Sequence, residues 1–292
     1  MTPGPRVVLG MPAYNRPDVL AKTLESLLSQ TVQDFALVIC DDAPSGAVAA
    51  IVEAYRGDFR WLVYEANPSR LGMVENWRRT FERGRALFPR SEYFAWVSDH
   101  DLWHPRWVEA MVATLDASPD VVLVYPRCLH VLSATIRMRG EGFETTAIAS
   151  RAARMRLAAR HMLAGDMIYG LMRAEALQAA GVFRRVVTPD RQVLMALSLF
   201  GRIKQLPEVL WYREISRGFD LQRQRDVFFP NGVPWYMYLP SHIQHCAVLL
   251  WDYGVCGKGR PAFGLLAGAG YAITQLWAST ARQIFRRKAW TT

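Results

Sequence analysis

Short, continuously apolar stretches alternate with longer amphipathic ones through the first hundred residues of this chain. The pattern predicts strands over residues 6–12, 35–41, 60–65 and 93–98, and helices over 16–30, near 46–56 and over 72–87. Because the apolar residues run on without alternating with polar ones, both faces of each strand should be covered. The expected fold class is therefore α/β, with a mostly parallel central sheet flanked by helices.

Polar side chains gather where three of these strands end. Tyr14 and Asn15 follow the first strand, Asp42 ends the second, and residues 98–101, Ser-Asp-His-Asp, follow the fourth. Ligands of such sheets bind outside the carboxyl ends of the strands. Crowded carboxylates repel one another unless a cation lies among them, and hard divalent cations prefer oxygen ligands and bridge phosphates. We therefore expect Mg²⁺ or Mn²⁺ carrying a diphosphate at this edge.

Composition and motifs exclude several other classes. A hydrophobic content of 51% rules out a largely disordered chain. The four cysteines lack the paired spacing of a zinc or redox motif, and the first residues lack the pattern of a signal peptide, so a cytoplasmic protein is expected. No glycine-rich dinucleotide or P-loop motif follows the first strand. The net charge of +9 is scattered and accompanies no nucleic-acid-binding motif, so a nucleic-acid partner is not expected.

Four segments, in order, resemble a known family. They are MPAYNRPDVLAKTLESLLSQTVQDFALVICDDAPSG, NPSRLGMVENWRRTFERG at 67–84, VSDHDLWHP at 97–105, and the segment 181–214 that begins GVF and closes on WYRE. Together they resemble the inverting family 2 glycosyltransferases of the GT-A fold, and the ordered match runs from residue 6 to about 214. The resemblance implies transfer of a sugar from a nucleotide diphosphate sugar to an acceptor hydroxyl.

The resemblance also implies a nucleotide-binding set. Asp42 would hold the base, because a carboxylate accepts hydrogen bonds from the N–H groups of uracil, thymine or guanine and so disfavours adenine and cytosine. A donor of the UDP, dTDP or GDP type follows. The residues implied to contact base, ribose or phosphates are Pro12, Tyr14, Asn15, Asp42, Arg70, Asn76 and Asp99.

The metal motif departs from the family. Where the family has D-x-D-D this chain has residues 98–101, so a position that often binds metal is His100. Either His100 is a ligand, which would favour Mn²⁺ over Mg²⁺ because imidazole is the softer donor, or Asp99 and Asp101 form the working pair. The second alternative is preferred. The histidine that the family has after the closing Y-R is missing, since Glu214 and Ile215 follow instead.

Asp190 is the expected general base. Thr188 is a plausible N-cap and Pro189 a first helical residue, which puts Asp190 in the first turn, where the helix dipole stabilises a carboxylate. The resemblance makes this aspartate the group that deprotonates the acceptor hydroxyl. With one base and no covalent nucleophile, the anomeric configuration inverts.

Domain limits and acceptor are less well defined. We expect a catalytic domain over 1–215, with a nucleotide-sugar half at 1–126 and an acceptor half at 127–215, and an aromatic and basic extension over 216–292. Within the extension, 261–281 is almost long enough to span a membrane but weakly apolar; it suits an anionic membrane surface, a soluble helix or a homodimer contact equally well.

The acceptor is expected to be a glycan, a cell-envelope polysaccharide or a lipid-linked sugar. A basic helix is also predicted over 151–165, in the acceptor half. Two other functions remain open at this point. One is a sugar-phosphate nucleotidyltransferase, which would need a glycine-rich basic loop after the first strand. The other is an inactive scaffold that binds nucleotide sugars.

Overall fold

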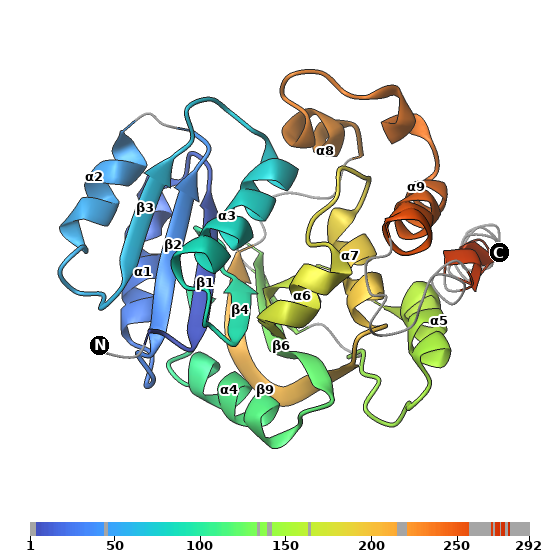
Figure 1. Ribbon diagram of the computed structural model, residues 1–292. Helices are drawn as coiled ribbons and strands as arrows, with labels where there is room; N and C mark the ends of the chain where they lie inside the picture. The colour runs from blue at the N-terminus through green and yellow to red at the C-terminus, as the bar shows by residue number, and fades with distance from the viewer. Residues whose placement is uncertain are drawn as a thin grey trace.

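The computed structural model describes residues 4–43, 46–132, 135–138, 142–162, 165–214 and 221–256, together with 270, 272–274, 276–277 and 280. Its first hundred residues alternate as predicted (Figure 1). The elements are β1 (Val7–Ala13), α1 (Pro17–Leu28), β2 (Phe35–Asp41), α2 (Ala47–Ala54), β3 (Leu62–Ala66), α3 (Met73–Leu87) and β4 (Tyr93–Trp96).

The second part of the chain mixes short strands and helices around the same sheet. It contains β5 (Leu102–Trp103), α4 (Trp107–Ala117), β6 (Val121–Leu132), β7 (Thr135–Met138), α5 (Arg151–His161), η1 (Met167–Tyr169), β8 (Leu171–Arg173), α6 (Ala174–Ala180), α7 (Pro189–Leu197) and β9 (Arg202–Glu214). The helix predicted over 151–165 is thus α5. An extension follows with α8 (Leu221–Phe228), η2 (Trp235–Tyr238), α9 (Ser241–Leu249) and the π-helical η3 (Leu250–Val255).

One sheet runs through the molecule in the order β3-β2-β1-β4-β8-β6-β9-β5, with β7 paired to β6. The pairs among β1 to β4 are parallel, and so is β6 with β9. Strands β5, β7 and β8 pair antiparallel with their neighbours. The predicted α/β class is confirmed, although the sheet is parallel mainly in its first half, where helices connect consecutive strands.

Strand β1 lies at the centre of the parallel half and is buried along its whole length, as is β2. Val8 and Gly10 face α3, because a side chain built at Gly10 would contact Thr80 and one built at Gly84 would contact Val8. Alternate residues of a strand point to opposite faces, so Val7 and Leu9 face the other layer. Burial on both faces explains why the strand carries no polar alternation.

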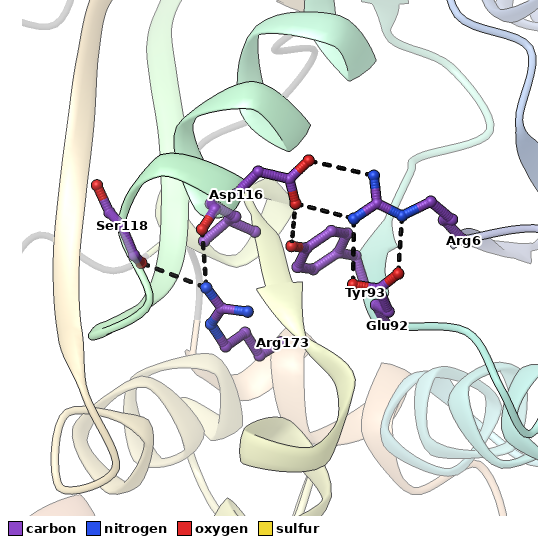
Figure 2. Close-up of polar contacts among 7 residues, drawn as sticks. Arg6, Glu92, Tyr93, Asp116, Ser118 and Arg173 are labelled. Atoms are coloured by element: carbon purple, nitrogen blue, oxygen red, sulfur yellow. Dashed lines mark hydrogen bonds and ion pairs between the residues drawn. The ribbon is translucent and has the colours of Figure 1, made fainter.

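The amino ends of the central strands are joined by a surface network (Figure 2). Arg6 donates to Glu92 at 2.7 Å and to Asp116 at 2.8 Å, and Tyr93 donates to the same Asp116 oxygen at 2.6 Å. Beside it, Arg173 donates to the carbonyls of residues 115, 118 and 121. Exposed ion pairs stabilise a fold only slightly, so the network mainly aligns the start of β4 with α4.

The segment after β9 packs against the first part of the chain rather than lying apart from it. Helix α8 contacts α3, and the carbonyl of Phe228 would lie 2.4 Å from a Cβ built at Gly72. Among the described residues, no helix combines the length and apolarity needed to cross a bilayer. Most of the apolar stretch at 261–281 lies outside the described residues.

A Gly10→Ala substitution should destabilise the protein. The added Cβ would lie 2.6 Å from Cζ of Phe94 and 2.7 Å from Cγ2 of Thr80. Overpacking of this kind costs about 1–3 kcal/mol, which urea denaturation would measure as a lower free energy of unfolding. Gly57→Ala is the control, since nothing lies within 4 Å of its Cβ. Equal stability of the two variants would contradict the packing of β1 on α3.

Candidate active site

A cavity of about 270 Å³ opens at the carboxyl ends of β1, β2 and β4. This is the edge at which the sequence predicts the ligand, and most of the predicted side chains meet there. The lining residues are Pro12, Tyr14, Arg16, Asp42, Arg70, Met73, Asn76, Trp77, Ser98, Asp99, His100, Tyr169 and Val227. Three predicted residues, Asn15, Asp101 and Asp190, do not line it.

Asp42 is buried and anchors the loop before α3. Its Oδ1 accepts from Nδ2 of Asn67 at 2.9 Å and from the backbone N–H of Leu71 at 2.7 Å, and its Oδ2 accepts from the N–H of Gly72 at 2.8 Å. A carboxylate oxygen accepts about two hydrogen bonds. Oδ2 can therefore accept one more, from a ligand N–H, while the same carboxylate fixes the loop.

Asn76 lines the cavity but its amide is already engaged. Nδ2 donates to the carbonyl of Cys40 at 3.0 Å and to that of Ala13 at 3.4 Å, and Oδ1 accepts from Asn67 at 2.9 Å. The side chain therefore ties the ends of β1 and β2 to the loop that holds Asp42. This geometry assigns Asn76 a structural role first, whereas the sequence resemblance implies contact with ribose or phosphate.

Tyr14 and Arg70 form one wall of the cavity. The guanidinium of Arg70 lies 4.7 Å from the centroid of the Tyr14 ring, within the range of a cation–π interaction. Within the described chain, the buried Nε of Arg70 has no hydrogen-bond partner. Tyr14 is 42% exposed, so its ring is free to stack on a ligand. Asn15, which follows with φ +53°, turns away into solvent; asparagine tolerates this left-handed conformation better than most residues.

The structure separates the two acidic residues of the predicted metal pair. Asp99 reaches the cavity, where Oδ2 accepts from the N–H of Tyr14 at 2.9 Å and Oδ1 lies 2.6 Å from Nδ1 of His100. Asp101 does not line the cavity: it accepts from Nε1 of Trp211 at 3.1 Å and from the N–H of Glu214 at 3.0 Å. Burial raises the pKa of Asp101. The residues that share the cavity are thus Asp99 and His100.

A metal ion at this position would have few protein ligands. Across the described ranges, no three His, Cys, Asp or Glu side chains are grouped so that they could enclose an ion. Mg²⁺ at nucleotide sites is commonly held by one or two carboxylates plus substrate phosphates, so Asp99 with His100 and a diphosphate is a compatible donor set. Burial lowers the pKa of His100, but the Asp99 hydrogen bond and the neighbouring Asp101 and Asp99 charges together raise it.

Asp190 lies in the first turn of α7, as predicted. Thr188 occupies the N-cap position, but the expectation that its side chain caps the helix is wrong: with φ +51° its hydroxyl donates to the carbonyl of Val187 instead. A positive φ is strained for a β-branched residue, and such strain is common at functional sites. Burial raises the pKa of Asp190 to about 6, although the charge of Arg213 opposes the increase.

Tyr169 and Arg213 lie near the cavity, and neither was singled out from the sequence. Tyr169 lines the cavity, and burial raises its pKa; the charge of Arg213 opposes the increase, and the charges of Asp101, Asp99 and Asp190 add to it. Arg213 lies 5.5 Å from the Tyr169 ring and donates to Asp166 at 2.9 Å, while Asp166 lies 3.2 Å from Nε2 of His130. The closing Y-R motif was the available signal for Arg213. Tyr169 lies in no motif.

Solved structures define the class of fold. The fold is similar to that of S. aureus TarS 1-349 in complex with UDP-GlcNAc, with a TM-score of 0.59 at 14% identity. The match covers 97% of this chain and 92% of the TarS chain. The fold is also similar to the mannosyltransferase PcManGT from Pyrobaculum calidifontis in complex with GDP-Man and Mn²⁺, with a TM-score of 0.54 at 14% identity, covering 97% of this chain and 88% of that one.

A sequence profile of glycosyl transferase family 2 matches residues 9–179, and the chain belongs to this family. The predicted family and enzyme class are confirmed. Relatives include the putative glycosyltransferase EpsE of Bacillus subtilis, 30% identical over 40% of each chain, and protein CgeD of the same species, 26% identical over 42% of this chain and 29% of CgeD. The matches thus cover less than half of these relatives, and Asp190 lies beyond the profile match.

An Asp42→Asn substitution should loosen the loop at residues 67–72. Both oxygens of Asp42 accept from N–H groups, so the amide nitrogen of an asparagine would face an N–H donor and leave it without an acceptor. A buried unsatisfied donor costs about 1–3 kcal/mol. Chemical denaturation should show a loss of that size in the free energy of unfolding. Asp58→Asn, at an exposed position, is the matched control and should have almost no effect. A fully stable Asp42→Asn variant would contradict the anchoring role.

Proposed function

We propose that this protein is an inverting glycosyltransferase that transfers a sugar from a nucleotide diphosphate sugar to an acceptor hydroxyl. The observation that carries the proposal is the cavity at the carboxyl edge of the sheet, which is lined by Asp42 after β2 and by Asp99 and His100 after β4. Structures of similar fold, TarS and PcManGT, were solved with UDP-GlcNAc and with GDP-Man.

The donor base would lie between Tyr14 and Asp42. The ring of Tyr14, with the Arg70 guanidinium beside it, offers a stacking surface, and Oδ2 of Asp42 accepts an N–H. Because adenine and cytosine present an acceptor where uracil, thymine and guanine present an N–H, the site favours UDP, dTDP or GDP sugars. Arg70 also supplies positive charge for the phosphates.

The diphosphate would lie against Asp99 and His100. These two residues would hold Mn²⁺ or Mg²⁺, with Mn²⁺ favoured by the imidazole nitrogen. PcManGT was solved with Mn²⁺. When bound, such an ion neutralises the negative charge that develops on the leaving diphosphate. Asp101 would act indirectly, by fixing the turn that presents Asp99 and His100 through its bonds to Trp211 and Glu214.

Asp190 would act as the general base. Its carboxylate takes the proton from the acceptor hydroxyl while the oxygen forms a bond to the anomeric carbon and the bond to the diphosphate breaks. A pKa near 6 keeps this carboxylate mostly ionised at neutral pH and makes it a stronger base than an ordinary aspartate. Attack from the side opposite the diphosphate inverts the configuration. Tyr169, which lines the cavity, would contact the transferred sugar.

The acceptor is proposed to be a glycan, a cell-envelope polysaccharide or a lipid-linked sugar, reached from the cytoplasmic side. The charge of Arg213 acts on the base, and a cation there suits an acceptor with a phosphate or carboxylate group. No described feature favours a nucleotidyltransferase. An inactive scaffold is distinguished by the two experiments below, because it would bind a donor without turning it over.

Donor binding can be tested by thermal shift. The melting temperature is measured with UDP, dTDP, GDP, ADP or CDP, each in the presence of Mn²⁺, Mg²⁺ or EDTA. A ligand that binds only the folded state raises the melting temperature, so the nucleotides should differ in how strongly they stabilise the protein. We expect the first three to stabilise most, and more strongly with Mn²⁺. His100→Gln should reduce the metal-dependent part, and His104→Gln, at a histidine that does not line the cavity, should not. No shift with any nucleotide would remove the donor proposal.

The base can be tested through the pH dependence of transfer. Because Asp190 must be deprotonated and has a folded-state pKa of about 6, kcat/KM should fall about tenfold per pH unit below that value. Asp190→Asn should lower kcat by about 10²–10⁴-fold and leave the donor thermal shift intact. Unchanged transfer by this variant would exclude Asp190 from the mechanism.

A further inference from the structure

Helix α9 and the π-helix η3 that continues it bury polar as well as apolar side chains, and the side chains that they expose are apolar. A surface helix normally buries its apolar stripe and exposes its polar one. Here the buried positions include Gln244, His245 and Asp252. The exposed positions are all apolar up to Val255: Ile243, Ala247, Leu250, Trp251 and Val255.

The buried polar face holds the loop that leads to the catalytic helix. Gln244 Oε1 accepts from the N–H of Val187 at 3.1 Å, and Nε2 of His245 lies 2.7 Å from the carbonyl of the same residue. About two turns further on, Arg184 donates to Asp252 at 2.6 Å. Burial lowers the pKa of His245 to about 4, so the ring is neutral and donates through Nε2. The polar residues are therefore used inside, which explains their burial.

Among the described residues, no contact of this kind explains why the outward face of α9 and η3 is apolar. Ile243, Leu250 and Trp251 are spaced i, i+7 and i+8, so they share one side of the helix. They are 40%, 37% and 60% exposed, and Val255, one turn on, is 63% exposed. The adjoining η2 packs on α9 and adds Trp235, 76% exposed, and Tyr238, 60% exposed. We call Trp235, Tyr238, Ile243, Leu250, Trp251 and Val255 the outer apolar face.

The charge of the chain selects the partner of this face. The chain carries a net charge of +9, and the sequence of residues 216–292 contains nine Lys and Arg against three Asp and Glu. Arg225 lies 4.6 Å from the ring of Tyr238. A second copy of this chain would bring the same excess of positive charge to the contact, which disfavours self-association. Trp, Tyr and basic residues beside aliphatic ones are the combination that binds an anionic bilayer surface.

We propose that the outer apolar face binds the surface of an anionic phospholipid bilayer. The apolar and aromatic side chains enter the boundary between headgroups and acyl chains, and Arg225, beside Tyr238, contacts the lipid phosphates. This proposal concerns binding only and does not rest on the proposed transfer reaction. It has one geometric consequence. The buried side of α9 contacts Val187, in the loop that leads to Asp190, so the bilayer and this loop lie on opposite sides of α9.

The test is flotation of the full chain with two kinds of vesicle, phosphatidylcholine alone and phosphatidylcholine with phosphatidylglycerol. Wild type should float with the anionic vesicles and dissociate as salt is raised. The triple variant I243S/L250S/W251S should partition at least about tenfold more weakly, because three apolar side chains no longer enter the lipid. Leu87→Ser is the matched control, because Leu87 is also 40% exposed but lies at the end of α3, outside the outer apolar face. This variant should bind vesicles as wild type does.

Three outcomes would overturn the proposal. One is equal binding of wild type and triple variant, or of anionic and neutral vesicles. A second is a wild-type dimer in light scattering that the triple variant dissociates, which would assign the face to a second copy. A third is a lower melting temperature of the triple variant than of Leu87→Ser, which would show that the chain's own C-terminal residues cover the face. Loss of donor binding with intact flotation would count against the transfer proposal alone.

Discussion

The buried carboxylate of Asp42 is the contact on which the candidate site depends. It receives two backbone N–H groups and one side-chain amide from the segment 67–72 and so fixes that segment over the end of β2. Arg70 is thereby held against Tyr14, and Gly72, at φ +87°, is held against the carbonyl of Phe228 in the extension. One charged group thus links the parallel sheet, the cavity wall and the C-terminal extension.

Much of this arrangement could be predicted from local sequence. Strands β1 and β2 are apolar at successive positions because they are buried on both faces, and that pattern is visible without a structure. The polar residues after them could be assigned to one edge because parallel strands end together. The position of Asp190 in the first turn of α7 followed from Pro189, whereas its expected role came from the family resemblance. The strands of the second half were harder, since β5 and β8 are two and three residues long and pair with distant partners.

Which of His100 and Asp101 lines the cavity could not be predicted from the sequence. It is decided by Trp211 and Glu214, more than a hundred residues further on, which bind Asp101 and leave Asp99 and His100 facing the cavity. Val227 joins the cavity lining for a similar reason, through the packing of α8 on α3. The burial of polar side chains in α9 is likewise a tertiary effect, because Gln244 and His245 form their hydrogen bonds with the backbone of Val187. Local periodicity does not contain these long-range contacts.

The central claim is that the nucleotide of a sugar donor occupies the cavity at the carboxyl edge of the sheet. Hydrogen exchange, compared with and without UDP or GDP in the presence of Mn²⁺, tests it most directly, because amides held by the occupied site exchange more slowly. Protection should concentrate in the peptides that contain Tyr14, the segment 67–72 and Asp99. Protection confined to the cleft formed by α3 and α6 around Arg78 and Arg85, with none at these three segments, would contradict the assignment.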